Sequence, residues 1–423
     1  MRSSLTTLSP ARRACAAVLP SLTFLVTFAA IAPVEARAQF AVRPEERWLR
    51  PPQSRAWSAA PQGQAPVNPR LLPDISVVGD LVGDLSPDGS TQEDGTRFGV
   101  REVELALQAN VDPFFRGDVF FGFSDEEGVH IEQAYLTLMV APLGFDLRGG
   151  RYLLPFTKQN TTHRHDLHTV EYPYVIQRFL GPEGARGTGL GVNRIFAPWG
   201  FYQELQVSVN DRLGEAPEDA VTVSPLNENL DGLMYTARLR NYWDLSRAAN
   251  LELSASVLTA LAEQPVSGAA DGVTAVAARQ NMFGVDVTYR WRPPQEGLYK
   301  SFILQAEWLR QQHRGPGALP PAAPGEVVVY EGLDRSFDGG YVFARWQVGY
   351  RGHVGARFDA LQDPEFGGGQ TRALSGYYEF FPSEFSKLVL AYERLNLPGG
   401  ARATDRILLQ ATFALGPHRP HPF

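Results

Sequence analysis

Residues 283–291 read FGVDVTYRW, a stretch in which apolar and polar side chains alternate. Phe283, Val285, Val287, Tyr289 and Trp291 fall on one face of an extended chain, and Asp286, Thr288 and Arg290 fall on the other. A period of two is the pattern of a β-strand whose two faces meet different surroundings. The stretch therefore predicts a half-buried strand.

The same alternation recurs from residue 74 to the end of the chain, and no long stretch with a helical period of 3.6 interrupts it. About sixteen strands are predicted, with bounds uncertain by a few residues. They are 74–85, 97–111, 116–124, 129–140, 145–154, 189–197, 201–210, 232–241, 249–260, 281–292, 298–311, 339–349, 353–360, 372–381, 387–395 and 405–415.

The connections between these segments differ in kind. Every second connection is short, as in DPFF, APLG, PWG and YRG, whereas the others include the long segments 155–188, 211–231, 261–280 and 312–338. Outer-membrane barrels have this asymmetry, with tight periplasmic turns and longer external loops.

Aromatic residues gather beside the short turns, where a membrane barrel places its aromatic girdle. They are Phe114, Phe115, Trp199, Phe201, Tyr242, Trp243, Trp291, Trp346, Phe380, Phe381 and Phe385. We therefore predict an all-β fold, a transmembrane antiparallel β-barrel of about 16 strands in the cell outer membrane. The alternative is a large soluble β-protein with aromatic residues in its core.

The N-terminal residues predict export. Residues 1–38 combine basic residues, an apolar stretch and the cleavage motif Ala36-Arg37-Ala38, as a secretory signal peptide does. A single membrane anchor is the alternative for this segment. Residues 39–73 are rich in Pro, Gln, Arg and Ala and are predicted to form a disordered periplasmic linker. Residues 74–423 are predicted to form the barrel.

Composition excludes several kinds of function. The one cysteine, Cys15, lies in the predicted signal peptide, so thiolate metal sites and cysteine nucleophiles are not expected. The net charge of −7 argues against a nucleic-acid partner. No G-x-S-x-G, H-E-x-x-H or phosphate-cradling glycine-rich motif occurs, so we expect no enzymatic activity.

A barrel of this size has a lumen wide enough for water, and the polar faces of its strands should line it. The predicted pore-lining residues are Glu102, Glu104, Arg116, Asp118, Glu132, Arg148, Arg238, Arg240, Asp286, Arg290, Arg345 and Arg357. Both signs of charge are present. Such residues either tune the passage of ions or stiffen the wall through ion pairs.

The stretch PFTKQNTTHRHDLH, residues 155–168, lies in the third and longest external connection. In sixteen-stranded porins this loop commonly folds inward, so by analogy 155–188 is the expected constriction. Lys158, His163, His165 and His168 are the residues expected there. Imidazole titrates near neutral pH and ligates metals, so the histidines are solvated loop residues, pore-lining contacts or a metal site.

Several stretches resemble one family. They are PDISVVGDLVG (73–83), FGVREVELALQANVDPFFRGDVFFGF (98–123), EEGVHIEQAYLTL (126–138), GGRYLLPFTKQN (149–160), HRHDLH (163–168), FLGPEG (179–184), YRWRPP (289–294), FPSEFSKL (381–388) and ALGPHRPHPF (414–423). They resemble porin-like outer-membrane proteins of the phosphate-selective porin O and P superfamily, in particular a subgroup often labelled zinc-regulated TonB-dependent outer-membrane receptor. The resemblance covers nearly all of the chain from residue 73 and adds zinc as the ion to consider at the histidines.

We therefore expect an outer-membrane porin-like channel through which small hydrophilic or ionic solutes diffuse, with no cofactor. The alternative is an outer-membrane receptor or zinc-associated uptake component that uses the histidine-rich third loop. Outer-membrane lipid is an expected partner, nucleic acid is not, and a homotrimer is the assembly considered. A hydrolase with dispersed catalytic residues is the weakest reading.

Overall fold

The computed structural model describes residues 73–92, 95–124, 128–139, 141, 144–211, 230–265, 275–314, 334–400 and 402–416. The predicted signal peptide (1–38) and the predicted linker (39–73), apart from Pro73, lie outside the described residues.

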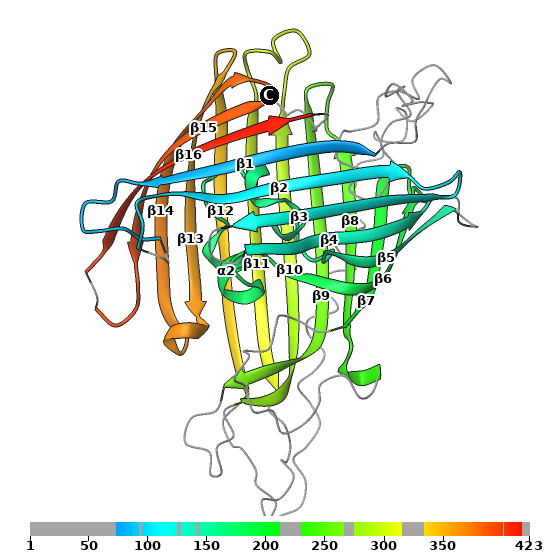
Figure 1. The fold of residues 1–423 in the computed structure, drawn as a ribbon. Coiled ribbons are helices and arrows are strands. Elements are labelled where there is room, and N and C mark those ends of the chain that lie inside the picture. The colour runs from blue at the N-terminus through cyan, green and yellow to red at the C-terminus, as the bar shows by residue number, and fades with distance from the viewer. Residues whose placement is uncertain are drawn as a thin grey trace, which may run out of the picture. The chain divides into compact units, whose positions relative to one another are not determined.

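Sixteen antiparallel strands form one closed barrel in which each strand pairs with its neighbours in sequence and β1 pairs with β16 (Figure 1). The strands are β1 (Asp74–Asp84), β2 (Phe98–Asn110), β3 (Phe115–Ser124), β4 (Gly128–Leu138), β5 (Phe145–Leu153), β6 (Arg186–Phe196), β7 (Tyr202–Asn210), β8 (Met234–Asp244), β9 (Ala249–Pro265), β10 (Ala275–Trp291), β11 (Phe302–Arg314), β12 (Arg335–Val348), β13 (Gly352–Asp363), β14 (Gly369–Ser383), β15 (Ser386–Asn396) and β16 (Thr404–Leu415). The predicted fold class and the order of its strands are confirmed.

The alternation seen in residues 283–291 becomes the two faces of β10. Phe283 is 43% exposed and Val285 is 39% exposed, whereas Asp286 and Thr288 are fully buried. A water-soluble barrel would show the opposite distribution, because apolar side chains gain free energy by leaving water. The outward apolar face of the barrel therefore needs lipid to cover it.

Several external connections differ from their predicted bounds. Strand β9 runs to Pro265 and β10 begins at Ala275, so much of the predicted connection 261–280 is strand. The residues concerned include ALAEQ (260–264) and AVAAR (275–279), whose alanines give little contrast between the two faces, so the period was not visible. Likewise β12 begins at Arg335, inside the predicted connection 312–338.

Aromatic rings do cluster at the short-turn end. The ring centroids of Phe201 and Trp243 lie 5.0 Å apart, and those of Trp291 and Trp346 lie 5.8 Å apart. The prediction that Phe381 belongs to the aromatic girdle is wrong, because its side chain is only 2% exposed. Its neighbour Phe380 is 36% exposed, and adjacent residues of a strand point to opposite faces.

Candidate functional site: the inner loop and the barrel wall

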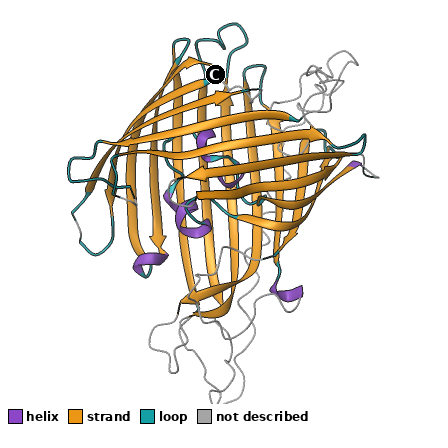
Figure 2. Cartoon of the chain, viewed as in Figure 1, coloured by secondary structure: helices purple, strands orange, loops and turns teal. Residues whose placement is uncertain are grey.

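The connection between β5 and β6, residues 154–185, packs inside the ring of strands, and we call it the inner loop. It contains the helical turns η5 (Gln159–Thr161) and η6 (Arg164–Asp166) and the short helix α2 (Tyr174–Leu180). Figure 2 shows these helices within the ring of strands. The predicted loop, 155–188, covers nearly the same residues as this connection, and its role as a constriction stays a prediction. In the described part of the chain, no helix has both the length and the apolarity that are needed to span a bilayer.

Apolar packing holds one side of the inner loop. Phe156, Val175 and Ile176 are fully buried and belong to a cluster with inward-facing residues of the wall. The wall members include Met234 of β8, Leu258 of β9, Met282 of β10 and Leu309 of β11. Fully burying such a side chain contributes about 1.5–3 kcal/mol, so this cluster favours a docked loop.

Sequence reasoning missed this apolar band on the inner wall. Leu258 follows Glu252, Ser254 and Ser256 in the polar phase of its strand, and Leu309 follows Glu307 in the same way. Apolar residues in a phase that should face water were the available signal. They mark where a segment of protein, rather than solvent, covers the wall.

Glycines leave room for the docked loop. A Cβ atom on Gly284 of β10 would lie 2.5 Å from Thr157 Cγ2, and one on Gly339 of β12 would lie 2.8 Å from Val175 Cγ2. Thr157 is the one described non-glycine residue with positive φ, at 54°. That conformation is rare for a β-branched residue, so close packing against the wall must hold it.

The start of the inner loop is bound to β9 and β11. The Lys158 Nζ atom lies 2.6 Å from a Glu252 carboxylate oxygen, and the Gln159 backbone N–H donates to Glu307 at 2.7 Å. Burial lowers the pKa of Lys158, and the nearby Arg290 lowers it further, to about 7 despite the Glu252 carboxylate. The loop thus carries an amine whose charge changes near neutral pH.

The end of the inner loop is bound to β13, β15 and β16. The Tyr174 N–H donates to Asp359 at 3.0 Å, and the Tyr174 hydroxyl donates to Glu393 at 2.6 Å. Arg406 donates to the same hydroxyl oxygen at 3.0 Å. Strand β15 also supplies Lys387, whose Nζ donates to loop carbonyl oxygens.

The carbonyl oxygens that accept hydrogen bonds from Lys387 Nζ belong to His165, at 2.7 Å, and Leu167, at 2.8 Å. On β2, Arg101 donates to the carbonyl oxygen of Val170 at 3.0 Å and lies 3.3 Å from Glu171. Burial alone would raise the pKa of Glu171, but Arg164 and Arg101 outweigh it and lower that pKa to about 2. The loop is therefore tied to strands on several sides of the barrel.

The structure keeps His163 and His165 together and separates them from His168. His163 Nδ1 lies 2.9 Å from Glu104, and its Nε2 lies 2.7 Å from the Gln133 amide nitrogen. Burial alone would lower the pKa of His163, but the charge and hydrogen bond of Glu104 outweigh it and raise that pKa to about 10. His168 instead lies 3.5 Å from Glu379, and burial, aided by Arg345, lowers its pKa.

Two groups of side chains have spacing that suits a metal ion. Among the described residues these are Glu104 with His163 and His165, and Glu102 with His130 and Glu132, each with ligand atoms within 4.8 Å of one another. A set made of all three loop histidines, as considered from sequence, is not among them, because the loop turns His168 toward β14. His130 was missed, although it shares the polar phase of Glu132.

Most of the residues predicted to line the pore are paired on the inner face. Arg238 lies 3.1 Å from Asp286, Arg240 lies 2.6 Å from Glu204, and Arg290 lies 3.4 Å from Glu252. Further pairs are Arg116 with Asp118 at 3.0 Å, Arg357 with Asp359 at 2.7 Å, Arg345 with Glu379, Glu132 with Arg186, and Glu104 with His163.

Arg148 differs from these pairs because it lies over an aromatic ring. Its guanidinium carbon lies 4.0 Å from the centre of the Tyr135 ring. The inner face thus combines charges of both signs with tight ion pairs.

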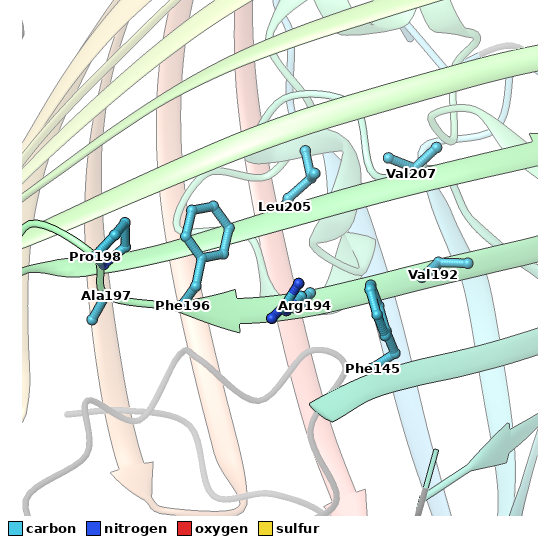
Figure 3. Close-up of a pocket in the computed structure, with 8 residues that line it drawn as sticks. All are labelled: Phe145, Val192, Arg194, Phe196, Ala197, Pro198, Leu205 and Val207. Atoms are coloured by element: carbon cyan, nitrogen blue, oxygen red, sulfur yellow. The ribbon is translucent and has the colours of Figure 1, made fainter. Parts of the chain in front are cut away.

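A separate groove lies on the outside of the barrel. It runs over β5, β6 and β7, where Phe145, Val192, Leu205 and Val207 line it, and the Arg194 guanidinium lies 5.0 Å from the Phe145 ring (Figure 3). Leu205 and Val207 are 40% and 43% exposed, like the other outward apolar residues. The groove is therefore part of the apolar outer face rather than of the lumen.

No protein-family model matches the chain. A protein of Aquifex aeolicus (strain VF5) described only as uncharacterized is 27% identical over 345 residues, which span 77% of this chain and 70% of that protein. This relative carries no information on function.

Solved structures with a similar fold are outer-membrane proteins. OprB of Pseudomonas putida has a TM-score of 0.52 at 9% identity, over 81% of this chain and 94% of that one. OmpT of Vibrio cholerae, in its trimer form, has a TM-score of 0.50 at 9% identity, over 81% and 99%. At these identities the likeness concerns the fold. The closed 16-stranded barrel and its apolar outer face make this chain an outer-membrane protein.

Proposed function

We propose that the chain is an outer-membrane channel through which small hydrophilic or ionic solutes diffuse, and that the inner loop forms its narrowest part. The observation that carries the proposal is a closed barrel with a charged inner face, crossed by a loop that is bound to β2, β9, β11, β13 and β15. Charged groups of both signs are costly away from water unless they are paired.

In this proposal the residues that filter solutes are charged residues of the wall and the loop residue Lys158. The wall residues are Glu102, Glu104, Arg116, Asp118, Glu132, Arg148, Arg238, Arg240, Asp286, Arg290, Arg345 and Arg357. Opposed charges across a lumen create a transverse field that acts on passing ions. Kinship with phosphate-selective porins stays a prediction from the quoted stretches, and a homotrimer is proposed because the similar OmpT is a trimer.

The test is electrical recording from purified protein inserted into planar lipid bilayers. We expect discrete steps of conductance that scale with salt concentration, as diffusion through a water-filled route does. A charge-neutral variant of a wall pair, Arg238→Gln with Asp286→Asn, should change the ion selectivity measured from the reversal potential. A folded protein that never conducts would contradict the proposal.

A receptor or metal-associated uptake component is the second candidate. The extensive docking of the inner loop favours it, because a firmly held loop could close the lumen as well as narrow it. This candidate predicts a folded protein that binds its ligand but gives no conductance steps. The same recording therefore separates the two.

A further inference from the structure

Three carboxylates lie together beneath the inner loop, from neighbouring parts of the wall. Glu102 and Glu104 are on β2 and Glu132 is on β4, and all three are at most 6% exposed. Buried carboxylates need a counter-charge or a set of hydrogen-bond donors, because burial removes the water that would otherwise stabilise them. Their partners therefore show what the site is built to hold.

Only two of the three carboxylates have such a partner in the described part of the chain. Glu104 faces His163, and Glu132 is paired with Arg186. Glu102 makes no ion pair there, and its Oε1 atom is buried without a hydrogen-bond donor. The cluster thus contains one buried carboxyl group that has no counter-charge among the described side chains.

The histidines supply the other kind of ligand. His163 Nδ1 and His165 Nδ1 lie 2.9 Å and 3.9 Å from the same Glu104 oxygen. Tetrahedral binding at metal–ligand distances of about 2.0–2.1 Å puts neighbouring ligand atoms roughly 3.3 Å apart. The observed spacings lie on either side of that value, so small movements of the side chains would bring them onto one ion.

We propose that Glu104, His163 and His165 bind one divalent transition-metal cation of the zinc class, and that Glu102 and Glu132 provide the surrounding negative charge. His163 lies 3.9 Å from Glu132, which joins this group to the Glu102–His130–Glu132 group. Mixed imidazole and carboxylate ligands favour zinc and its neighbours over magnesium or calcium. The bound ion would tie the inner loop to β2, independently of whether the channel conducts.

The test is a titration of the purified full-length protein in detergent, after chelator treatment, with Zn²⁺ followed by calorimetry and with Co²⁺ followed by its visible absorption. We expect about one ion per chain and Co²⁺ bands typical of four-coordinate nitrogen and oxygen ligands. Glu104→Gln and His165→Gln should each weaken binding at least tenfold. Glu102→Gln should weaken it less, because Glu102 acts through charge.

His168→Gln is the matched control, since His168 is on the same loop but faces Glu379. It should leave the affinity within about twofold of the wild type. Heat-modified mobility on gels shows that each variant is a folded barrel. Wild-type protein that binds no ion, Glu104→Gln or His165→Gln variants with wild-type affinity, or binding that is lost in His168→Gln would overturn the proposal.

Discussion

At the scale of single residues, the contacts of the inner loop decide its position. Lys158 is the clearest case, because it lies between one carboxylate, Glu252, and two guanidinium groups, Arg240 and Arg290. Its folded-state pKa of about 7 lies below the ordinary 10.5. Charging this amine therefore opposes docking: the penalty is full below about pH 7 and disappears as the pH rises toward 10.5.

Lys158→Met should remove this penalty. We expect the thermal midpoint of Lys158→Met in detergent to exceed that of the wild type by more at pH 6 than at pH 10. At pH 6 the buried wild-type lysine is charged, and burying a charged amine lowers the stability of the folded protein. Lys300→Met is the control, since Lys300 is half exposed in a short turn. A Lys158→Met difference that is the same at both pH values would show that the amine docks without a change in its affinity for protons.

Residue positions on the wall were largely predictable, whereas the partners of loop residues were not. A period of two placed Glu104, Arg238 and Asp286 on one face because each strand is locally regular. His163 meets Glu104, and His168 meets Glu379, through a loop whose path depends on packing far away in sequence. Local pattern therefore suggested a set of three histidines that the fold divides.

At the scale of elements, the inner loop and the strands that receive it fit one another. The loop presents Thr157 to Gly284 of β10, where a methyl group would leave too little space. The same strands carry apolar residues, among them Met282 and Leu309, in a phase that is otherwise polar. Two independent features of the wall thus match the docked loop. One is the glycine that leaves space for it, and the other is the set of apolar side chains that pack against it.

Gly284→Ala should loosen the inner loop. Overpacking of this kind typically costs about 1–3 kcal/mol, and here the new methyl group must displace Thr157. We expect faster tryptic cleavage at Lys158, Arg164 or Arg178, with the barrel itself intact. Gly376→Ala in β14 is the control, since its added methyl group would meet no atom within 4 Å. Equal cleavage of the two variants would argue against the close fit at β10.

Strand order followed from the sequence because each hairpin pairs neighbours, so no long-range choice was needed. The ends of β9 and β10 were harder, because alanines there carry no contrast between lipid and lumen. Phe381 shows a similar difficulty: its ring resembles the girdle aromatics, but its phase along β14 turns it inward. Residue type alone was misleading where phase was decisive.

At the scale of the whole molecule, the barrel separates an apolar outside from a charged inside, and the inner loop is docked against that inside. Replacing loop residues 157–182 by a short Gly/Ser linker would leave every strand and its neighbours in place. It would remove α2 and the anchors to β9, β11, β13 and β15. The comparison between this variant and the wild type isolates the loop.

The most direct measurement is the swelling rate of liposomes that contain either protein, in sugars of increasing size. We predict that the wild type admits only the smallest sugars, and that the linker variant admits larger ones several times faster. Swelling rates are compared only between preparations in which both proteins show the heat-modified mobility of folded barrels. An identical size limit for the two proteins would contradict the claim that the inner loop forms the narrowest part of an aqueous route.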